Sequence, residues 1–246
     1  MTVPSLVVLF FLAPISSLSP VQRGDIQFAL IQYPLAEAIY DSALVGALDS
    51  SEVLWRMARL YVCQGDVSSP DEKLALYQMA EGFARRCIAI DSTKAEGHTW
   101  RAAALGNIAM FEGAKTRVRL CTSIKEELDL SIRLNPADDI PYSILGSFYA
   151  ALGSVTWLER QLAEIFLGSL PAGGFPEAEQ AFKHAITLAP DVIRHRFELG
   201  DLYARQDRNR EALEQFRMVM SLPVGVANDR RTKRFAEKLI NELSDE

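Results

Sequence analysis

Apolar residues recur along most of this chain at intervals of three and four, the spacing that places them on one face of an α-helix. Short polar, glycine-containing or proline-containing breaks separate these stretches, as expected where one helix ends and the next begins. The pattern predicts helices over residues 22–31, 35–48, 51–64, 71–90, 94–111, 115–134, 138–152, 155–168, 175–189, 192–206, 209–221 and 227–243. The chain is therefore expected to be all-α.

Two pairs of these helices share one motif. The first helix of each pair contains Leu-Gly-x2-Tyr, at residues 199–203 and 145–149, and the second contains Ala-x3-Phe, at residues 212–216 and 178–182. This spacing resembles the tetratricopeptide repeat, a helix–turn–helix unit of 34 residues. The small residues let two helices approach closely, and the aromatic residues fill the space to the next hairpin. Because one hairpin buries too little apolar surface alone, we expect four to five hairpins to stack into a right-handed solenoid over residues 21–246.

One connection between the helices is much longer than the others. Tyr149 and Ala178 are separated by 29 positions, whereas the corresponding Tyr203 and Ala212 are separated by 9. Apolar residues within the extra segment fall at helical spacing over residues 155–168. The sequence therefore predicts an inserted amphipathic helix between the two helices of one hairpin.

The inserted segment also carries a family resemblance. Trp-Leu-Glu-Arg at residues 157–160 and Phe166, together with Phe-Glu-Gly-Ala-Lys at 111–115, are similar to the regulator of microtubule dynamics family over about residues 22–243. The resemblance implies tetratricopeptide-like repeats and a non-catalytic interaction protein. Animal members of the family are linked to microtubules, mitochondria and membrane contacts. Trp157, Glu159, Arg160 and Phe166 form the family motif; this helix is expected to pack onto the hairpins, or alternatively to bind a partner.

The first helix of each hairpin lines the concave face of a tetratricopeptide solenoid. Positions two residues before and after the motif leucine are expected to face this groove, and Ala103 and Ser143 are among them. The candidate partner-binding residues are Trp55, Arg59, Asn107, Ser147, Arg194, Phe197, Asp201 and Arg205. Aromatic anchors at both ends and charges of both signs suit an extended peptide or helix. The alternative interpretation is a solvated inner wall, with Trp55 in the core.

Motifs for catalysis are not found. The sequence has no glycine-rich phosphate loop, His-Glu-x2-His, Gly-x-Ser-x-Gly or Cys-x2-Cys, so we expect no enzyme activity, no cofactor and no metal. A net charge of −6 disfavours nucleic acid as a partner. The three histidines, at 98, 184 and 195, are too few for a metal site on their own. Cys63 and Cys87 are expected to be small fillers in facing helices; a disulfide between them is the alternative if the chain is exported.

The two ends of the chain add separate predictions. Within residues 1–20, the apolar run 6–13 has the length of a signal-peptide core and is too short to span a membrane. The chain is thus expected to be exported or membrane-associated if this segment is a signal, and cytoplasmic otherwise. The last helix places Phe235 and three aliphatic residues opposite a basic face, which is typical of an amphipathic closing helix; a patch for nucleic acid or acidic lipid is the alternative.

Two functions are compatible with these patterns. The leading prediction is a protein-interaction scaffold that binds a partner peptide or helix in the concave groove. The alternative is a carrier that holds a lipid or another apolar small molecule in the solenoid interior, in a cavity lined by Trp157 and Phe166.

Overall fold

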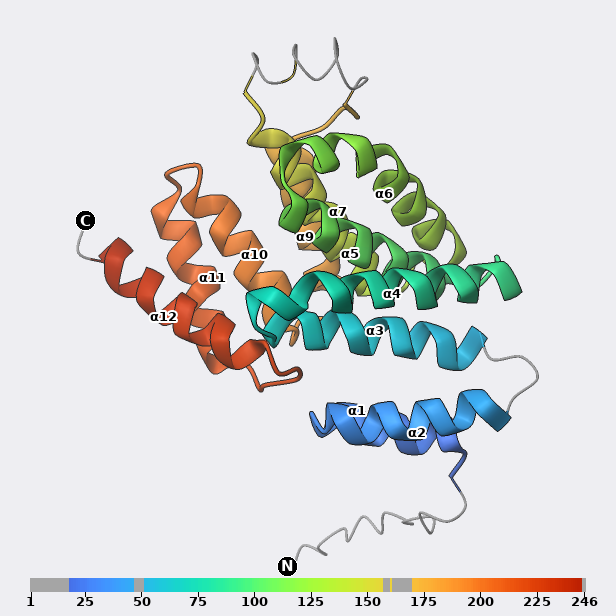
Figure 1. Cartoon of the computed structure of the whole chain (residues 1–246). Helices are drawn as coiled ribbons and strands as arrows, with labels where there is room; N and C mark the ends of the chain where they lie inside the picture. The colour runs from blue at the N-terminus through green and yellow to red at the C-terminus, as the bar shows by residue number, and fades with distance from the viewer. Residues whose placement is uncertain (1–17, 47–50, 157–159, 161–169, 245–246) are drawn as a thin grey trace, which may run out of the picture.

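Helical hairpins follow one another along the whole described part of the protein, which is shown in Figure 1 as a computed structural model. The structure describes residues 18–46, 51–156, 160 and 170–244. The helices are α1 (Pro20–Ala29), α2 (Tyr33–Gly46), α3 (Ser51–Val67), α4 (Pro70–Ile90), α5 (Ala95–Glu112), α6 (Ala114–Leu134), α7 (Asp139–Gly153), α9 (Phe175–Leu188), α10 (Ile193–Ala204), α11 (Asn209–Ser221) and α12 (Asp229–Ser244).

The predicted fold class is confirmed, because the helices pair as a tetratricopeptide solenoid requires. The hairpins are α1–α2, α3–α4, α5–α6, α7–α9 and α10–α11, and α12 packs against the last of them. The first helices of successive hairpins also contact one another, from α3 to α5, α5 to α7 and α7 to α10. Most of the predicted inserted helix, 155–168, lies outside the described residues. The helix that follows α7 in Figure 1 is therefore numbered α9.

Local sequence explains where several helices begin. Ser19 accepts a hydrogen bond from the backbone N–H of Gln22, whose side chain accepts from the backbone N–H of Ser19 in return, and Pro20 occupies the first helical position of α1. Asp138 caps α7 by accepting from the backbone N–H of Ile140. These caps satisfy backbone donors that have no partner within the helix.

The glycine of the Leu-Gly motif allows close helix packing, as predicted, in two hairpins. Gly146 of α7 faces the ring of Phe182 on α9, and Gly200 of α10 faces Phe216 on α11. A β-carbon at Gly146 would lie only 2.5 Å from the Phe182 ring. Gly106 of α5 differs, because a β-carbon there would meet nothing within 4 Å. Its hairpin carries Leu128 in place of the aromatic residue.

The buried side chains form two clusters along the solenoid. The first joins the hairpins from α1 to α6 and includes Ile144 of α7, and the second joins α9, α10, α11 and α12 and includes Ala150 of α7. Tyr40, Leu54 and Met57 are fully buried in the first part of the chain, and Phe182 and Phe216 in the second. The aromatic residues of the motif are therefore the largest components of the core, as the repeat predicts.

The ends of the solenoid meet. The Tyr33 hydroxyl, at the start of α2, accepts a hydrogen bond of 3.2 Å from the backbone N–H of Ala227, just before α12. Arg231 Nη1 donates to the backbone carbonyl of Asp66 at the end of α3, at 3.4 Å. Figure 1 shows the segment before α12 beside the end of α3. The described chain thus curls until its last hairpin and its capping helix reach its first two hairpins.

The closing helix α12 is amphipathic, with one difference from the prediction. Leu239, Ile240 and Leu243 pack against the second cluster as expected. Phe235 is 48% exposed, and Ala236 is buried instead. The helix is rotated so that the small alanine makes the close contact, and Arg231 lies over the exposed phenylalanine ring, 5.8 Å from its centroid.

Candidate functional site

A hollow of about 310 Å³ lies on the inner face of the solenoid, where α3, α5 and the start of α7 come together. Two tryptophans line it, Trp55 from α3 and Trp100 from α5. The remaining lining residues are Arg59, Glu96, Asn135, Ala137, Asp138, Asp139 and Ile140. The N-terminal parts of three successive first helices build the hollow together with residues 135–138 before α7, so that solenoid stacking rather than any one helix creates it. Two of the predicted groove residues, Trp55 and Arg59, share this hollow.

Arg59 is held firmly by the first hairpin. Its Nη2 donates to Asp25 Oδ1 at 3.0 Å and to the Tyr40 hydroxyl at 3.3 Å. The guanidinium carbon lies 3.8 Å from the centroid of the Phe28 ring. Only 20% of the side chain is exposed. Arg59 therefore joins α3 to α1 and α2, and it shares the carboxylate of Asp25 with Arg56.

Trp55 stands at the edge of the same network. Its indole Nε1 donates to Glu52 Oε2 at 3.2 Å, and the Arg56 guanidinium lies 4.1 Å from the ring centroid. Arg56 itself forms salt bridges with Asp25 and Glu52 at 2.8 and 2.7 Å. Trp55 is half-buried, so it belongs neither wholly to the core nor wholly to the solvated wall.

The opposite wall of the hollow is acidic. Glu96, Asp138 and Asp139 line it together. Burial raises the pKa of Asp138 to about 6. The hydrogen bond from the backbone N–H of Ile140 lowers this pKa, and the negative charges of Asp139 and Glu96 raise it further. Asp139 Oδ2 has a partner of its own, His195 Nε2 of α10, at 2.7 Å. This wall was not predicted from the sequence.

A second group of predicted residues gathers on α10. Asp201 and Arg205 form a salt bridge of 2.6 Å, and Ser147 of α7 donates to Glu198 Oε2 at 3.4 Å. Burial raises the pKa of Glu198, and the positive charge of Arg194 offsets part of this rise. Charged side chains of both signs therefore face the interior from α10.

Arg194 also acts across the concave face. Its charge is felt by Asp66 of α3, where burial raises the pKa and Arg194 is the largest opposing influence. The α10 end and the α3 end of the inner face are therefore close in space. Phe197 contacts Phe216 with ring centroids 5.7 Å apart, so it is joined to the core of the last hairpins.

Three other predicted positions differ in exposure. Asn107 of α5 is half-buried on the first helix of its hairpin. Ala103 and Ser143, which were expected to face the groove, are buried, with 7% and 1% of their surfaces exposed. Adjacent first helices pack closely enough at these positions to cover small side chains.

The family-motif residues fall mostly outside the described part of the chain. Trp157, Glu159 and Phe166 are among the residues that the structure does not describe. Arg160 is described, and its Nη2 donates to the carbonyl of Leu152 in α7 at 3.4 Å. The signal-peptide prediction also lies outside the described residues, apart from the three positions 18–20.

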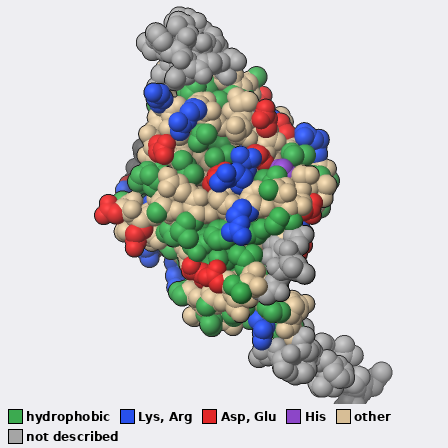
Figure 2. All heavy atoms as spheres, turned by 45° about the vertical axis from the view of Figure 1, so that its right-hand side comes forward, with side chains coloured by type: hydrophobic (Ala, Val, Ile, Leu, Met, Phe, Trp, Pro, Cys, Tyr) green, Lys and Arg blue, Asp and Glu red, His purple; other side chains and the backbone are tan. Residues whose placement is uncertain are grey.

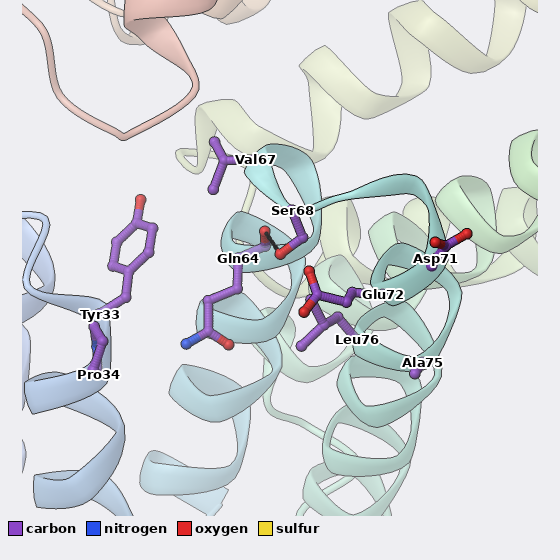
Figure 3. Close-up of a pocket in the computed structure, with 9 residues that line it drawn as sticks. All are labelled: Tyr33, Pro34, Gln64, Val67, Ser68, Asp71, Glu72, Ala75 and Leu76. Carbon is purple, nitrogen blue, oxygen red and sulfur yellow. Dashed lines mark hydrogen bonds between the residues drawn. The ribbon is translucent and has the colours of Figure 1, made fainter.

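A second and larger hollow, of about 620 Å³, lies between α2 and the α3–α4 hairpin (Figure 3). Tyr33 and Pro34 line one side, and Gln64, Glu72 and Leu76 are among the residues opposite. The Tyr33 hydroxyl points away from these residues toward the C-terminal segment that holds it. None of the predicted groove residues lines this hollow, so the inner-face hollow is the better candidate site.

The histidines have structural partners. His98 Nδ1 lies 2.5 Å from Glu127 Oε2, and Nε2 lies 2.9 Å from the carbonyl of Ser92. Burial opposes the charged form, but these hydrogen bonds outweigh it and raise the pKa of His98. The rings of His184 and Tyr142 are in contact, with centroids 4.2 Å apart. Within the described part of the chain, no group of three or more histidine, cysteine or acidic side chains is arranged to hold a metal ion.

All three cysteines are free thiols. Cys87 is buried, as predicted for a filler, whereas Cys63 of α3 is half-buried. Burial raises the pKa of both thiols to about 12. Neither thiol is therefore ionised near neutral pH, and neither has the reactivity of a catalytic cysteine.

The arrangement defines a tetratricopeptide-like helical repeat protein with a mixed aromatic and charged inner face. One solved structure with this architecture is a thermophilic tetratricopeptide-repeat protein from Thermus thermophilus, with a TM-score of 0.66 at 22% identity. The alignment covers 90% of this chain and 97% of that one. At this identity the likeness concerns the fold alone.

A family model described as regulator of microtubule dynamics protein 1-3 matches residues 32–244. The chain belongs to this family. It is 25% identical over 197 residues to regulator of microtubule dynamics protein 2 of Macaca fascicularis, covering 79% of this chain and 48% of that protein. It is 25% identical over 200 residues to protein 1 of Bos taurus, covering 80% and 63%. The chain thus spans about half to two thirds of the length of these relatives.

Two further observations concern the surface. Side chains of both charges lie among hydrophobic ones on the face shown in Figure 2. Among the helices that the structure describes, none combines the length and the apolar composition that crossing a membrane requires.

Proposed function

We propose that this chain is a non-catalytic scaffold that binds a peptide or helix of a partner protein along the inner face of its solenoid. The observation that carries the proposal is the hollow built by α3, α5 and α7, in which Trp55 and Trp100 lie beside charged side chains. Tryptophan and arginine are the side chains that most often anchor a protein interface. The relatives are named for microtubule dynamics, but this chain spans only part of their length, so the proposal stops at a protein partner.

The predicted groove residues have two different roles in this proposal. Trp55, Asn107, Arg194 and Arg205 are the contact candidates, because each is at least partly exposed. Arg59 positions the site, because its guanidinium is already held by the first hairpin. In the same way Asp201 orients Arg205, and Ser147 and Phe197 support the α7 and α10 walls.

A catalytic function is disfavoured by the chemistry of the inner face. Asp66 and Glu198 have raised pKa values there, and Cys63 is the cysteine of α3. Its thiol pKa of about 12 keeps it protonated at neutral pH.

The carrier of a lipid or apolar small molecule is the second candidate. Charged side chains on the inner face, such as Asp66, Arg194 and Glu198, make a poor lining for an acyl chain, since a buried charge without a partner is costly. Trp157 and Phe166, which were expected to close an apolar cavity, lie outside the described residues. A peptide with polar groups suits the described face better.

Selection of displayed random peptides on the full chain tests the scaffold. Enriched peptides are then measured by fluorescence anisotropy against Trp55→Ala and Arg194→Gln. Phe235→Ala and Arg210→Gln are the matched controls, because they remove an exposed aromatic ring and an exposed arginine from α12 and α11. We expect Trp55→Ala to weaken binding by at least about tenfold and the controls to leave it unchanged. Equal binding by the inner-face variants and the controls would refute the inner-face site.

A further inference from the structure

Two carboxylates in the inner-face hollow stand outside the salt bridges that join its other charged groups. Glu96 lies in the first turn of α5, and Asp138 caps α7. Asp138 Oδ1 accepts from the backbone N–H of Ile140 at 3.1 Å, which leaves Oδ2 for another donor. Within the described chain, neither carboxylate takes part in a salt bridge. Two neighbouring negative charges in a partly buried hollow repel each other unless a cation joins them.

The cations nearest to this wall are already engaged. Arg59 shares Asp25 with Arg56, and Lys94 forms its salt bridge with Glu52 while also interacting electrostatically with Glu96. Arg56 contacts the same two carboxylates, Asp25 and Glu52. Three cations on the α3 side, Arg56, Arg59 and Lys94, thus share the two carboxylates Asp25 and Glu52. With Glu96, Asp138 and Asp139 on the opposite wall, five carboxylates stand against these three cations, and the hollow as a whole carries excess negative charge.

The aromatic residues of the hollow also favour a cation. Trp55 already has the guanidinium groups of Arg56 and Arg59 at 4.1 and 5.1 Å from its ring centroid, so Trp100, which is 8% exposed where it lines the hollow, is the ring left for a further cation. A tryptophan ring face attracts an ammonium or guanidinium group more strongly than other aromatic rings do. The volume of about 310 Å³ is at the lower end of ligand-binding pockets.

We propose that this hollow binds one basic side chain, a lysine or arginine, of the partner peptide, with the charged head between Glu96 and Asp138 and the aliphatic stem along Trp100. The inference rests on the proposed function, because it places a peptide on the inner face, and it names the residue chemistry that the face selects. An acidic or neutral side chain would leave the two carboxylates without a partner.

The titration of Asp138 provides a second signature. Its pKa of about 6 is set by burial first, with Asp139 of the same helix and Glu96 of α5 raising it and His195 of α10 lowering it. Arg59 lines the hollow from α3 but remains engaged with Asp25. A bound cation favours the ionised carboxylate, so binding should weaken as the pH falls through about 6.

The test uses the ¹⁵N-labelled full chain and Nα-acetyl-lysine N-methylamide as the probe. The indole N–H signals of Trp55 and Trp100, assigned by Trp→Phe variants, report binding. The matched neutral probe is the same molecule acetylated on Nε. We expect the lysine probe to shift the Trp100 indole signal, the neutral probe to leave it in place, and binding to be weaker at pH about 5 than at pH about 7.5.

The double variant Glu96→Gln/Asp138→Asn tests the two carboxylates. Asparagine still caps a helix, so α7 should form as before. We expect the lysine probe to bind at least about tenfold more weakly. Glu126→Gln/Glu237→Gln removes two exposed carboxylates elsewhere and should bind the probe as the unmodified chain does. Circular dichroism checks each fold, and Asp138→Asn alone replaces the double variant if that does not fold.

Several outcomes would overturn the inference. Equal shifts with the charged and neutral probes, a stronger response to Nα-acetyl-aspartate N-methylamide, or no shift at the highest soluble concentration would each do so. Selected peptides that need Trp55 but contain no lysine or arginine would also overturn it while leaving the scaffold function intact. Failure of the proposed scaffold function would give a different result, because the selected peptides would then bind Trp55→Ala as tightly as the unmodified chain.

Discussion

The same substitution in the same motif should have opposite effects on stability in two hairpins. Gly146 and Gly106 both follow the motif leucine on the first helix of a hairpin. A β-carbon at Gly146 would lie 2.5 Å from Phe182, which is fully buried. At Gly106 a β-carbon would meet no atom within 4 Å. Alanine should therefore destabilise the protein at position 146 and stabilise it at position 106.

The magnitudes follow from two opposing contributions. Replacing glycine by alanine inside a helix gains about 0.8–1 kcal/mol at both positions. Forcing a β-carbon into a packed contact costs about 1–3 kcal/mol, at position 146 only. We expect Gly106→Ala to raise the free energy of unfolding by up to about 1 kcal/mol and Gly146→Ala to lower it by up to about 2 kcal/mol. The difference between the variants isolates the contact with Phe182, because the helix propensity is common to both.

Urea unfolding followed by circular dichroism measures both free energies, and thermal unfolding gives an independent check. A chain of this size shifts its melting temperature by about 2–4 °C for each kcal/mol. Gly200→Ala, opposite Phe216, should behave like Gly146→Ala, and Gly82→Ala, with open space around it, like Gly106→Ala. The reasoning is refuted if Gly146→Ala and Gly106→Ala change stability in the same direction by the same amount.

Three more predictions concern titrating and capping groups. Asp229→Ala should lower the free energy of unfolding by about 1–3 kcal/mol in urea titrations, because the carboxylate accepts from two backbone amides of the preceding loop at 2.8 and 2.9 Å; Asp229→Asn should lose less. Burial lowers the pKa of His98, but its contact with Glu127 outweighs this effect and raises the pKa above 6.5. The protonated histidine should therefore stabilise the fold fully below pH 6.5, and this stabilisation should be lost as the pH rises through the folded-state pKa. Glu127→Gln should make the free energy of unfolding, measured in urea, depend less on pH. Cys63 should react with iodoacetamide far more slowly in the native chain than in urea at pH about 8, since burial raises its pKa to about 12; equal rates would contradict its described position.

The repeat could be predicted because its signals are local. The Leu-Gly and Ala-x3-Phe spacings lie within single helices, and each fixes how one hairpin packs. The sequence also contains the reason why Gly106 differs. The helix that pairs with α5 has Leu128 where other hairpins have a phenylalanine or tyrosine, so no aromatic ring packs against Gly106. Trp55 and Arg59 could be assigned to the inner face for the same reason, since their register on α3 follows from the motif.

The acidic wall of the hollow could not be predicted in this way. Glu96 and Asp138 are 42 positions apart, and they meet only because α5 and α7 stack side by side. Each carboxylate also stands at the start of a helix, where acidic residues are common for purely local reasons. The role of Arg59 was equally hidden, because its partner Asp25 lies on the first hairpin.

The hydrogen bond between Tyr33 and Ala227 joins residues that are 194 positions apart. A linear array of repeats needs only neighbour contacts, so its terminal units can melt one at a time. Here the last segment packs against the first cluster of buried residues, and loss of either end removes contacts from the other. Folding must close this very long loop, whose entropic cost grows only slowly with its length. The two ends of the solenoid should therefore unfold in one cooperative step, and removal of residues 222–244 should destabilise the first hairpin as well as the last.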